Sequence, residues 1–173
     1  MKLFLIGYRC TGKTTIGKAI AGALNVDFID LDEFIVQRAG RQINEIVAEH
    51  GWSHFRALEK QALQEVMRCS NPVVVSCGGG VVMHEELLPE IKASGLVVWL
   101  KADISTILDR ILKDSVTGTQ RPSLISGMQL EEEIRQTLKQ RLPLYERWAD
   151  VMVQTDEVNV NEAVKEIRRL VSI

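Results

Sequence analysis

A phosphate-binding loop near the start of the chain constrains the fold more than any other feature of the sequence. The apolar run from Lys2 to Ile6 breaks into Gly7-Tyr-Arg-Cys-Thr-Gly-Lys-Thr14, which fills every fixed position of the pattern G-x-x-x-x-G-K-[ST]. Apolar residues then recur at helical spacing between Ile16 and Leu24. Because a buried strand, a glycine-bearing loop and a helix follow in this order, the sequence predicts a nucleotide-binding α/β protein rather than a glycine turn beside a surface lysine.

The residue types of this loop suit the binding of phosphate. Gly7 and Gly12 allow the backbone to curl, so that successive N–H groups point at phosphate oxygens near the positive end of a helix. Lys13 adds a full charge for the β- and γ-phosphates, and Thr14 offers a hydroxyl to Mg²⁺. Thr15 is expected to make a further phosphate contact. We call residues 7–15 the P-loop, and its predicted nucleotide-binding set also includes Cys10 and Thr11.

Length and charge limit the remaining possibilities. With 173 residues, of which 46% are hydrophobic, the chain can bury one good core, so we expect a single domain over residues 1–173. The 21 basic and 23 acidic residues give a net charge of −2, so no basic field favours nucleic acid or an anionic membrane. Three cysteines without C-x-x-C spacing, and the lack of a long apolar N-terminal segment, predict a cytoplasmic protein. We expect a monomer.

Two carboxylates follow the second predicted strand. Val26 to Asp30 has the pattern of a short strand, and the chain continues as Asp30-Leu-Asp32. Strand alternation would direct both carboxylates to the same side, at the carboxyl end of a strand, where α/β proteins bind ligands. The pair is therefore a candidate for catalysis. Acidic residues are also favoured at a helix N-terminus, and a helical pattern begins at Glu33, so both interpretations can hold together.

Between residues 31 and 72 only helical patterns occur, which is more than a simple crossover needs, and we interpret this segment as a helical substrate-binding insertion. It contains Phe55-Arg56 followed by Glu59, although an isolated arginine is often only a surface residue. The next strand, Val73 to Ser76, precedes three glycines at residues 78–80. Such a run is costly in a plain turn, and the close approach of a ligand to bare backbone explains it better.

The second half of the chain predicts a lid and the rest of the sheet. Residues 114–123 have the composition of a loop and carry Arg121, which suits a lid that closes over ATP, although a merely flexible connection has the same composition. Arg141-Leu-Pro-Leu-Tyr145 contains a helix breaker. The remaining predicted elements are a strand at Leu96 to Leu100, helices at Ile104 to Lys113 and Leu130 to Leu142, a strand at Val151 to Gln154, and a helix at Val158 to Ile173.

Taken together and in this order, these signatures resemble the shikimate kinase family along essentially the whole chain. The P-loop alone is shared by many nucleotide hydrolases, but Asp30-x-Asp32, Phe55-Arg56 with Glu59, the glycines at 78–80, Arg121-Pro122 and Arg141 are specific in combination. The resemblance implies an α/β P-loop three-layer fold with five parallel strands in the order 2-3-1-4-5. It also implies transfer of the γ-phosphoryl group of ATP to the 3-hydroxyl of shikimate, with Mg²⁺, on the way to chorismate and the aromatic amino acids.

The resemblance also implies a role for each matching residue. Asp32 would hold the accepting hydroxyl, Arg56 and Arg141 would clamp the shikimate carboxylate, and Gly78, Gly79 and Gly80 would contact the ring hydroxyls. Lys13 and Arg121 would act on the transferring phosphates, Arg110 would lie against the adenine, and Asp30 would reach the Mg²⁺ beside Thr14. The strand from Val73 to Ser76 carries no Walker B aspartate, and in the family the residue that matches Asp30 partly fills this gap.

Two other functions stay open on the sequence. A related small-molecule kinase for gluconate or a nucleotide would use the same loop, and its acceptor would compete with shikimate in an assay. A nucleotide-dependent switch protein would show partner binding without turnover, but the chain has no N-K-x-D sequence for guanine.

Overall fold

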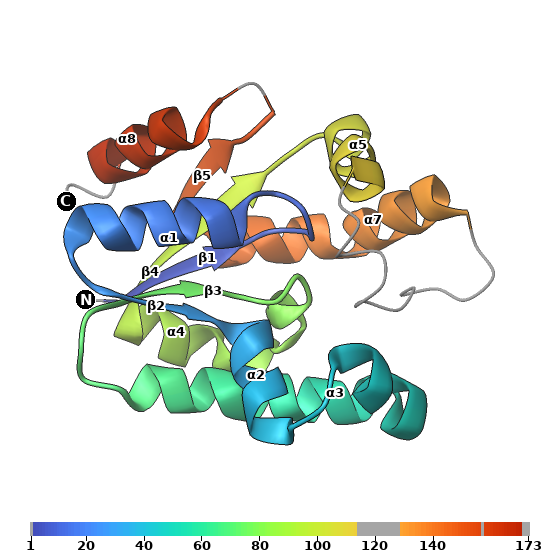
Figure 1. The fold of residues 1–173 in the computed structure, drawn as a ribbon. Helices are drawn as coiled ribbons and strands as arrows, with labels where there is room; N and C mark the ends of the chain where they lie inside the picture. The colour runs from blue at the N-terminus through green and yellow to red at the C-terminus, as the bar shows by residue number, and fades with distance from the viewer. Residues whose placement is uncertain (1, 114–128, 157, 171–173) are drawn as a thin grey trace.

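A five-stranded parallel sheet forms the centre of the protein (Figure 1). The computed structural model describes residues 2–113, 129–156 and 158–170. The spatial order of the strands is β2-β3-β1-β4-β5, which confirms the predicted order 2-3-1-4-5, and every pair is parallel. The strands are β1 (Lys2–Ile6), β2 (Asp27–Asp30), β3 (Val73–Ser76), β4 (Gly95–Lys101) and β5 (Val151–Gln154).

Helices cover both faces of the sheet and make three layers (Figure 1). Helices α1 and α8 pack on one face, and most of the others pack on the opposite face. The helices are α1 (Lys13–Leu24), α2 (Leu31–Ala39), α3 (Ile43–Arg68), α4 (Leu88–Ser94), α5 (Ile104–Lys113), α7 (Leu130–Trp148) and α8 (Val160–Leu170). Two short 3-10 helices, η1 (Val81–Met83) and η2 (Glu85–Leu87), precede α4.

The central strand shows how the sequence produces the two layers of core. Every residue of β1 is buried, and successive side chains alternate between the faces. Leu3 and Leu5 join the core beneath α1 and α8, whereas Phe4 and Ile6 join the larger core beneath the other helices. A strand that is apolar on both sides is typical of a parallel sheet covered by helices.

The carboxyl ends of three neighbouring strands bring the predicted site residues to one edge of the sheet. The P-loop follows β1, α2 begins directly after β2, and the three glycines follow β3. In the register of the sheet, Ser76 pairs with Leu5 on one side and with Asp30 on the other. Segments that are about seventy residues apart in sequence therefore end side by side, at the edge where parallel α/β sheets bind ligands.

The local structure departs from the sequence expectation at two places. Asp32 lies in the first turn of α2 and not on a strand, so the argument from strand alternation was wrong. The helix α7 continues through Pro143 to Trp148, where a break was expected. The interruption of helix α3 at Gly51, whose φ of 79° and ψ of 169° are not helical, agrees with the separate helical patterns expected at Glu45 to His50 and Ser53 to Cys69.

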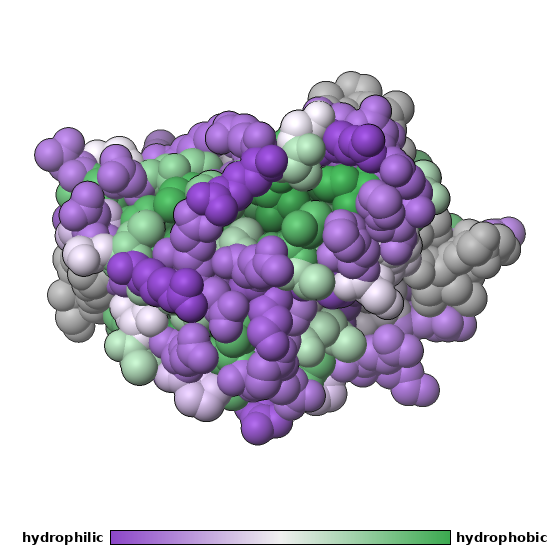
Figure 2. Space-filling view, turned by 90° about the horizontal axis from the view of Figure 1, so that it is seen from below, coloured by the Kyte–Doolittle hydropathy of each residue, from purple (hydrophilic) through white to green (hydrophobic). Residues whose placement is uncertain are grey.

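Charged and polar side chains cross the face shown in Figure 2 in bands, with apolar residues between them. On and around α3, several charged side chains are paired, including Lys60 with Glu86 at 2.8 Å and Arg38 with Glu65. Among the residues that the structure describes, none of the helices is both long and apolar enough to cross a membrane. The predicted lid at 114–123 lies outside the described residues.

Candidate active site

The P-loop adopts a conformation that requires its glycines. Gly7 has a φ of 143°, and a Cβ atom built on it would lie 2.3 Å from the carbonyl oxygen of Leu100, so a side chain cannot fit there. Gly12 has a φ of 92° and caps the N-terminus of α1. The first turn of α1 contains no acidic residue, which leaves the positive end of the helix dipole uncompensated by charge on that turn. An anion is favoured at this position.

The loop is tied together by its own side chains. The ammonium group of Lys13, which is buried, donates to the carbonyl oxygens of Gly7 at 2.9 Å and Tyr8 at 2.7 Å. The hydroxyl of Thr11 donates to the same carbonyl of Tyr8 at 2.8 Å. These contacts hold the charge of Lys13 within the curve of the loop. Thr15 is exposed, and Cys10 is half-buried in the left-handed region with a φ of 61°.

Thr14 and Asp30, the predicted metal pair, are in direct contact. The Thr14 hydroxyl donates to Oδ2 of Asp30 at 2.7 Å and lies 3.5 Å from the hydroxyl of Ser76. The other carboxylate oxygen of Asp30 caps α2 by accepting the N–H groups of Asp32 at 3.1 Å and Glu33 at 3.4 Å. Hydroxyl and carboxylate oxygens are the hard ligands that Mg²⁺ prefers. Because both Asp30 oxygens already accept hydrogen bonds, the carboxylate suits an indirect contact with the ion through water.

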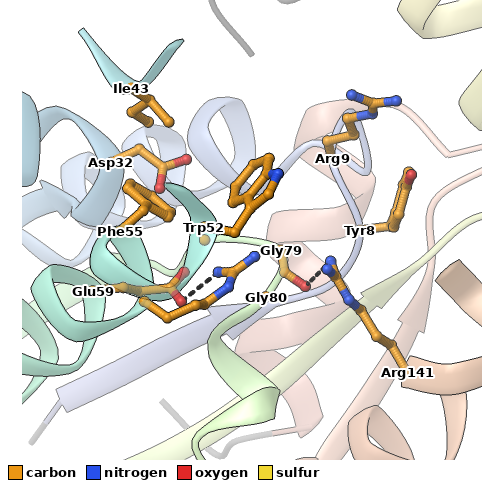
Figure 3. A pocket seen from close by; sticks show the side chains of 12 residues that line it. Tyr8, Arg9, Asp32, Ile43, Trp52, Phe55, Glu59, Gly79, Gly80 and Arg141 are labelled. Atoms are coloured by element: carbon orange, nitrogen blue, oxygen red, sulfur yellow. Dashed lines mark hydrogen bonds and ion pairs between the residues drawn. The ribbon is translucent and has the colours of Figure 1, made fainter. Parts of the chain in front are cut away.

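A pocket of about 450 Å³ lies beside the P-loop and unites all the residues that the sequence assigns to an acceptor (Figure 3). Asp32 enters from α2, Arg56 from α3, the glycines from the segment after β3, and Arg141 from α7. The lining is completed by residues to which the sequence assigned no role: Tyr8, Arg9, Ile43, Trp52, Phe55 and Glu59. The pocket therefore carries three guanidinium groups, two carboxylates and an aromatic wall.

Arg56 is held by a buried carboxylate. Its Nη1 donates to Oε2 of Glu59 at 2.5 Å, and Glu59 is fully buried. The same oxygen lies 3.0 Å from Nε2 of His84, a buried residue between η1 and η2. Burial by itself would raise the pKa of Glu59, but the hydrogen bond from His84 and the charge of Arg56 outweigh it and lower the pKa. The carboxylate is therefore ionised at neutral pH.

The crowding around Gly78 and Gly80 explains why the sequence has glycine there. A Cβ atom at Gly78 would lie 2.4 Å from Oε1 of Glu59 and 3.0 Å from Oδ1 of Asp32. A Cβ atom at Gly80 would lie 2.2 Å from the Arg56 guanidinium. Side chains of the protein itself thus account for these two glycines. Around Gly79 a Cβ atom would meet only ordinary contacts, with the P-loop backbone.

Arg141 and Tyr145 hold the middle glycine from α7. Nη1 of Arg141 donates to the carbonyl oxygen of Gly79 at 2.9 Å, and the hydroxyl of Tyr145 donates to the same oxygen at 2.5 Å. The fully buried Tyr145 ring stacks on Trp99 of β4, with ring centroids 5.8 Å apart. Because α7 continues through Pro143, both donors lie one helical turn apart on the same face.

A buried ion pair, which sequence reasoning missed, joins the P-loop to the start of α7. Nη2 of Arg9 lies 2.7 Å from Oε1 of Glu133, and the two side chains are 10% and 3% exposed. The partners are 124 residues apart in sequence, so no local pattern could pair them. The one available signal was a charged residue within a short phosphate-binding loop.

Arg110 lies on α5, against the outside of the P-loop. It donates to the carbonyl of Cys10 at 3.2 Å and to the hydroxyl of Thr155 at 3.3 Å. Thr155 in turn donates to the carbonyl of Thr11 at 3.2 Å. The structure thus places Arg110 next to the nucleotide loop but not in the acceptor pocket. Arg121 lies outside the described residues.

Comparison with known proteins identifies one family for this chain. The family model described as shikimate kinase matches residues 9–172. A shikimate kinase of Syntrophus aciditrophicus is 38% identical over 96% of this chain and 89% of its own. A crystal structure of shikimate kinase from Bacteroides thetaiotaomicron superposes with a TM-score of 0.89 at 32% identity, over 100% of this chain and 99% of that one.

A second solved structure, shikimate kinase from Acinetobacter baumannii in complex with shikimate, gives a TM-score of 0.88 at 27% identity. It covers 99% of this chain and 92% of its own. The family model spans almost the whole sequence, and the relative from Syntrophus exceeds 30% identity over nearly the full length of both chains. By these matches, together with its P-loop and the strand order of its sheet, the chain belongs to the shikimate kinase family.

Proposed function

We propose that the protein transfers the γ-phosphoryl group of ATP to the 3-hydroxyl of shikimate, giving shikimate 3-phosphate and ADP. The observation that carries this proposal is the convergence of Arg56, Arg141 and Asp32 on one pocket that borders the P-loop. Such a pocket suits a small acceptor with one carboxylate and several hydroxyls, placed next to a phosphate donor. Family membership supports the same activity.

The residues on the acceptor side of the site are assigned to different chemical groups of shikimate. Guanidinium groups form planar, paired hydrogen bonds with carboxylates, so we assign Arg56 and Arg141 to the shikimate carboxylate. The backbone of residues 78–80 is open to the pocket and serves the ring hydroxyls, chiefly at Gly79. Asp32 is 9% exposed and lies in the pocket wall, where it can orient the attacking hydroxyl and accept its proton.

The nucleotide side depends on charge and position. The P-loop amides and Lys13 would hold the β- and γ-phosphates, Arg121 would approach them from the lid, and Arg110 would border the adenine. Thr14 and Asp30 would hold the Mg²⁺ that accompanies ATP, which neutralises charge as the phosphoryl group is transferred. Phosphoryl transfer needs little covalent help from protein, so these residues act by positioning and by stabilising negative charge.

A coupled assay of ADP release with ATP, Mg²⁺ and shikimate tests the proposal directly. We expect turnover with shikimate and none above background with gluconate or a nucleoside monophosphate at equal concentration. Lys13→Met should remove most of the turnover in a protein with an unchanged circular dichroism spectrum, because its charge acts on the transferring phosphates. Turnover with gluconate or a nucleotide instead of shikimate would reassign the acceptor.

Metal dependence separates the two aspartates. Asp30→Asn should recover part of its activity as Mg²⁺ is raised, because a weakened contact to the ion is offset by metal concentration. Asp32→Asn should lose about two to four orders of magnitude in turnover without recovery, since its charge acts on the acceptor hydroxyl. Recovery of the Asp32 variant alone would show that the assigned roles are reversed.

We also propose that the protein works as a cytoplasmic monomer. Cys10, Cys69 and Cys77 are all free thiols, which suits a reducing compartment. Sedimentation at assay concentration gives the oligomeric state.

A further inference from the structure

His84 lies behind the acceptor pocket and contacts the pocket residue Glu59. It is not among the lining residues, and its side chain is 9% exposed. Nε2 of His84 lies 3.0 Å from Oε2 of Glu59. An ionised carboxylate can only accept hydrogen bonds, so Nε2 must carry a proton and donate.

The Glu59 carboxylate is held through one oxygen. Oε2 accepts from both Arg56 and His84, whereas Oε1 is buried without a hydrogen-bond partner among the described residues. The rotation of this carboxylate therefore depends on two donors. If His84 no longer donated, Arg56 alone would fix the carboxylate, at the same time as Arg56 must face the acceptor.

Arg56 has to serve two carboxylates. One is Glu59, and under the proposed function the other belongs to shikimate. The guanidinium is also confined by packing, since it lies 5.4 Å from the ring centroid of Trp52 and 5.5 Å from that of Phe55. The hydrogen bond from His84 satisfies part of the hydrogen-bonding capacity of the Glu59 carboxylate. It also fixes the edge of the Arg56 guanidinium that the carboxylate occupies. The remaining edge then stays directed at the pocket.

We propose that His84 is a positioning residue for acceptor binding, which acts through Glu59 to orient the Arg56 guanidinium toward the shikimate carboxylate. The inference rests on the proposed function and adds to it a residue that never touches the substrate. The backbone of His84 makes its own turn bonds, from its N–H to Val81 at 3.1 Å and from Leu87 to its carbonyl at 2.9 Å. Any residue except proline has the groups for these bonds, so the side chain can be tested separately from the turn.

Glutamine and asparagine at this position form a matched pair of variants. The terminal amide nitrogen of glutamine can reach the place of Nε2, whereas that of asparagine stops near the place of Nδ1. We expect His84→Asn to raise the KM for shikimate about tenfold, the effect of losing a hydrogen bond to a charged group, with kcat changed by less than about threefold. His84→Gln should restore the KM to within about threefold of the wild type, and the KM for ATP should stay the same in both.

A cycle with Arg56 tests whether the effect passes through that arginine. In an Arg56→Ala background, His84→Asn should change the affinity for shikimate by less than about twofold, measured by calorimetry, because the group it positions is gone. A tenfold loss of shikimate affinity on His84→Asn that persists without Arg56 would overturn the inference. So would an equal rise in the KM for shikimate in the His84→Gln and His84→Asn variants, or an unchanged KM in a folded His84→Asn protein. A wild-type protein that binds no shikimate would overturn the proposed function as well.

Discussion

Tyr8 and Tyr145, the two tyrosines of the chain, are both buried near the acceptor pocket. Tyr8 belongs to the P-loop, and Tyr145 contacts the glycine segment from α7. Burial is the main cause that raises the pKa of both hydroxyls, and it raises the pKa of Tyr145 to about 12, although nearby arginines partly oppose it. A tyrosine in an unfolded chain titrates near about pH 10.

The raised pKa values predict that the tyrosines ionise at a higher pH in the folded protein than in the unfolded chain. At pH 10, absorbance of tyrosinate near 295 nm should be lower in the native state than in denaturant, where it is about half-developed. Because the folded pKa lies above the unfolded one, this contribution to stability is complete below about pH 10 and is lost as the pH rises toward about 12. Tyr145→Phe should reduce the loss of stability in that range, and normal titration of both tyrosines in the native state would contradict the structure.

At the scale of elements, the P-loop and α7 are joined by the buried pair Arg9 and Glu133. Removing the Glu133 carboxylate leaves the buried charge of Arg9 without this partner, so Glu133→Gln should lower the free energy of unfolding by about 3 kcal/mol. Urea unfolding monitored by circular dichroism measures this change. The double variant Arg9→Met with Glu133→Leu should lower the free energy of unfolding less than Glu133→Gln does, because neither charge then remains buried.

The same helix turn supplies a matched control. Glu131 pairs with Arg135 at 3.0 Å, but the two side chains are 56% and 57% exposed. Solvent screens such a pair, so Glu131→Gln should change the free energy of unfolding by less than about 0.5 kcal/mol. Equal effects at positions 131 and 133 would show that the buried pair does not join the two elements as described.

Substitution by alanine at two glycines that lie in open space should change the free energy of unfolding in opposite directions. A Cβ atom at Gly22 in α1 or at Gly51 in α3 would meet nothing within 4 Å, so crowding plays no part. Gly51 has backbone angles in a region that is almost restricted to glycine, so Gly51→Ala should lower the free energy of unfolding by about 1–3 kcal/mol. Gly22 has ordinary helical geometry, so Gly22→Ala should raise the free energy of unfolding by about 0.5–1 kcal/mol. Urea midpoints that move the same way in both variants would contradict these assignments.

Elements whose signals are local could be predicted from the sequence. The strand before Gly7, the helix after it, and the helix at Ile104 to Lys113 appear where their patterns placed them. The helix through Pro143 could not be predicted, because a proline costs about 3 kcal/mol locally. The following turn buries Tyr145 and Trp148 completely, and burying each such side chain contributes about 2 kcal/mol or more, which offsets the cost.

The residues of the candidate site also fall into two groups, those that sequence motifs identify and those whose partners lie far away in the sequence. Motif residues such as Arg56 and Arg141 could be named in advance because the resemblance assigns them, and the fold brings them to one pocket. Arg9 and His84 could not be named, because their partners Glu133 and Glu59 lie 124 and 25 residues away. Asp32 was named correctly as a pocket residue for a wrong reason, since a helix and not a strand directs it there.

At the scale of the whole molecule, the pocket is assembled from segments that lie far apart in the sequence. The P-loop, α2, α3, the glycine segment and α7 each supply part of its wall, and the buried ion pair of Arg9 and Glu133 joins the P-loop to α7. One buried carboxylate, Glu59, contacts Arg56 on the same helix and His84 between η1 and η2, so its charge state bears on the stability of the fold. The lowered pKa of Glu59 makes this dependence measurable.

The stability of the protein should fall in acid through Glu59. Because its folded pKa lies below that of an unfolded glutamate, near about 4.3, its contribution is present above that pH and is lost as the pH falls through the folded pKa. At pH 7, Glu59→Gln should lower the free energy of unfolding by about 3 kcal/mol, since it leaves the charge of Arg56 without its partner.

As the pH falls below about 4.3, the difference between wild type and Glu59→Gln should shrink, because the wild-type carboxylate becomes neutral as well. Urea unfolding at several pH values between 7 and 3 measures this difference. Glu131→Gln, which removes an exposed carboxylate, should differ little from the wild type at every pH. A difference at position 59 that stays constant down to pH 3 would mean that Glu59 stabilises the fold by its shape and packing, and not as the buried anion that holds Arg56.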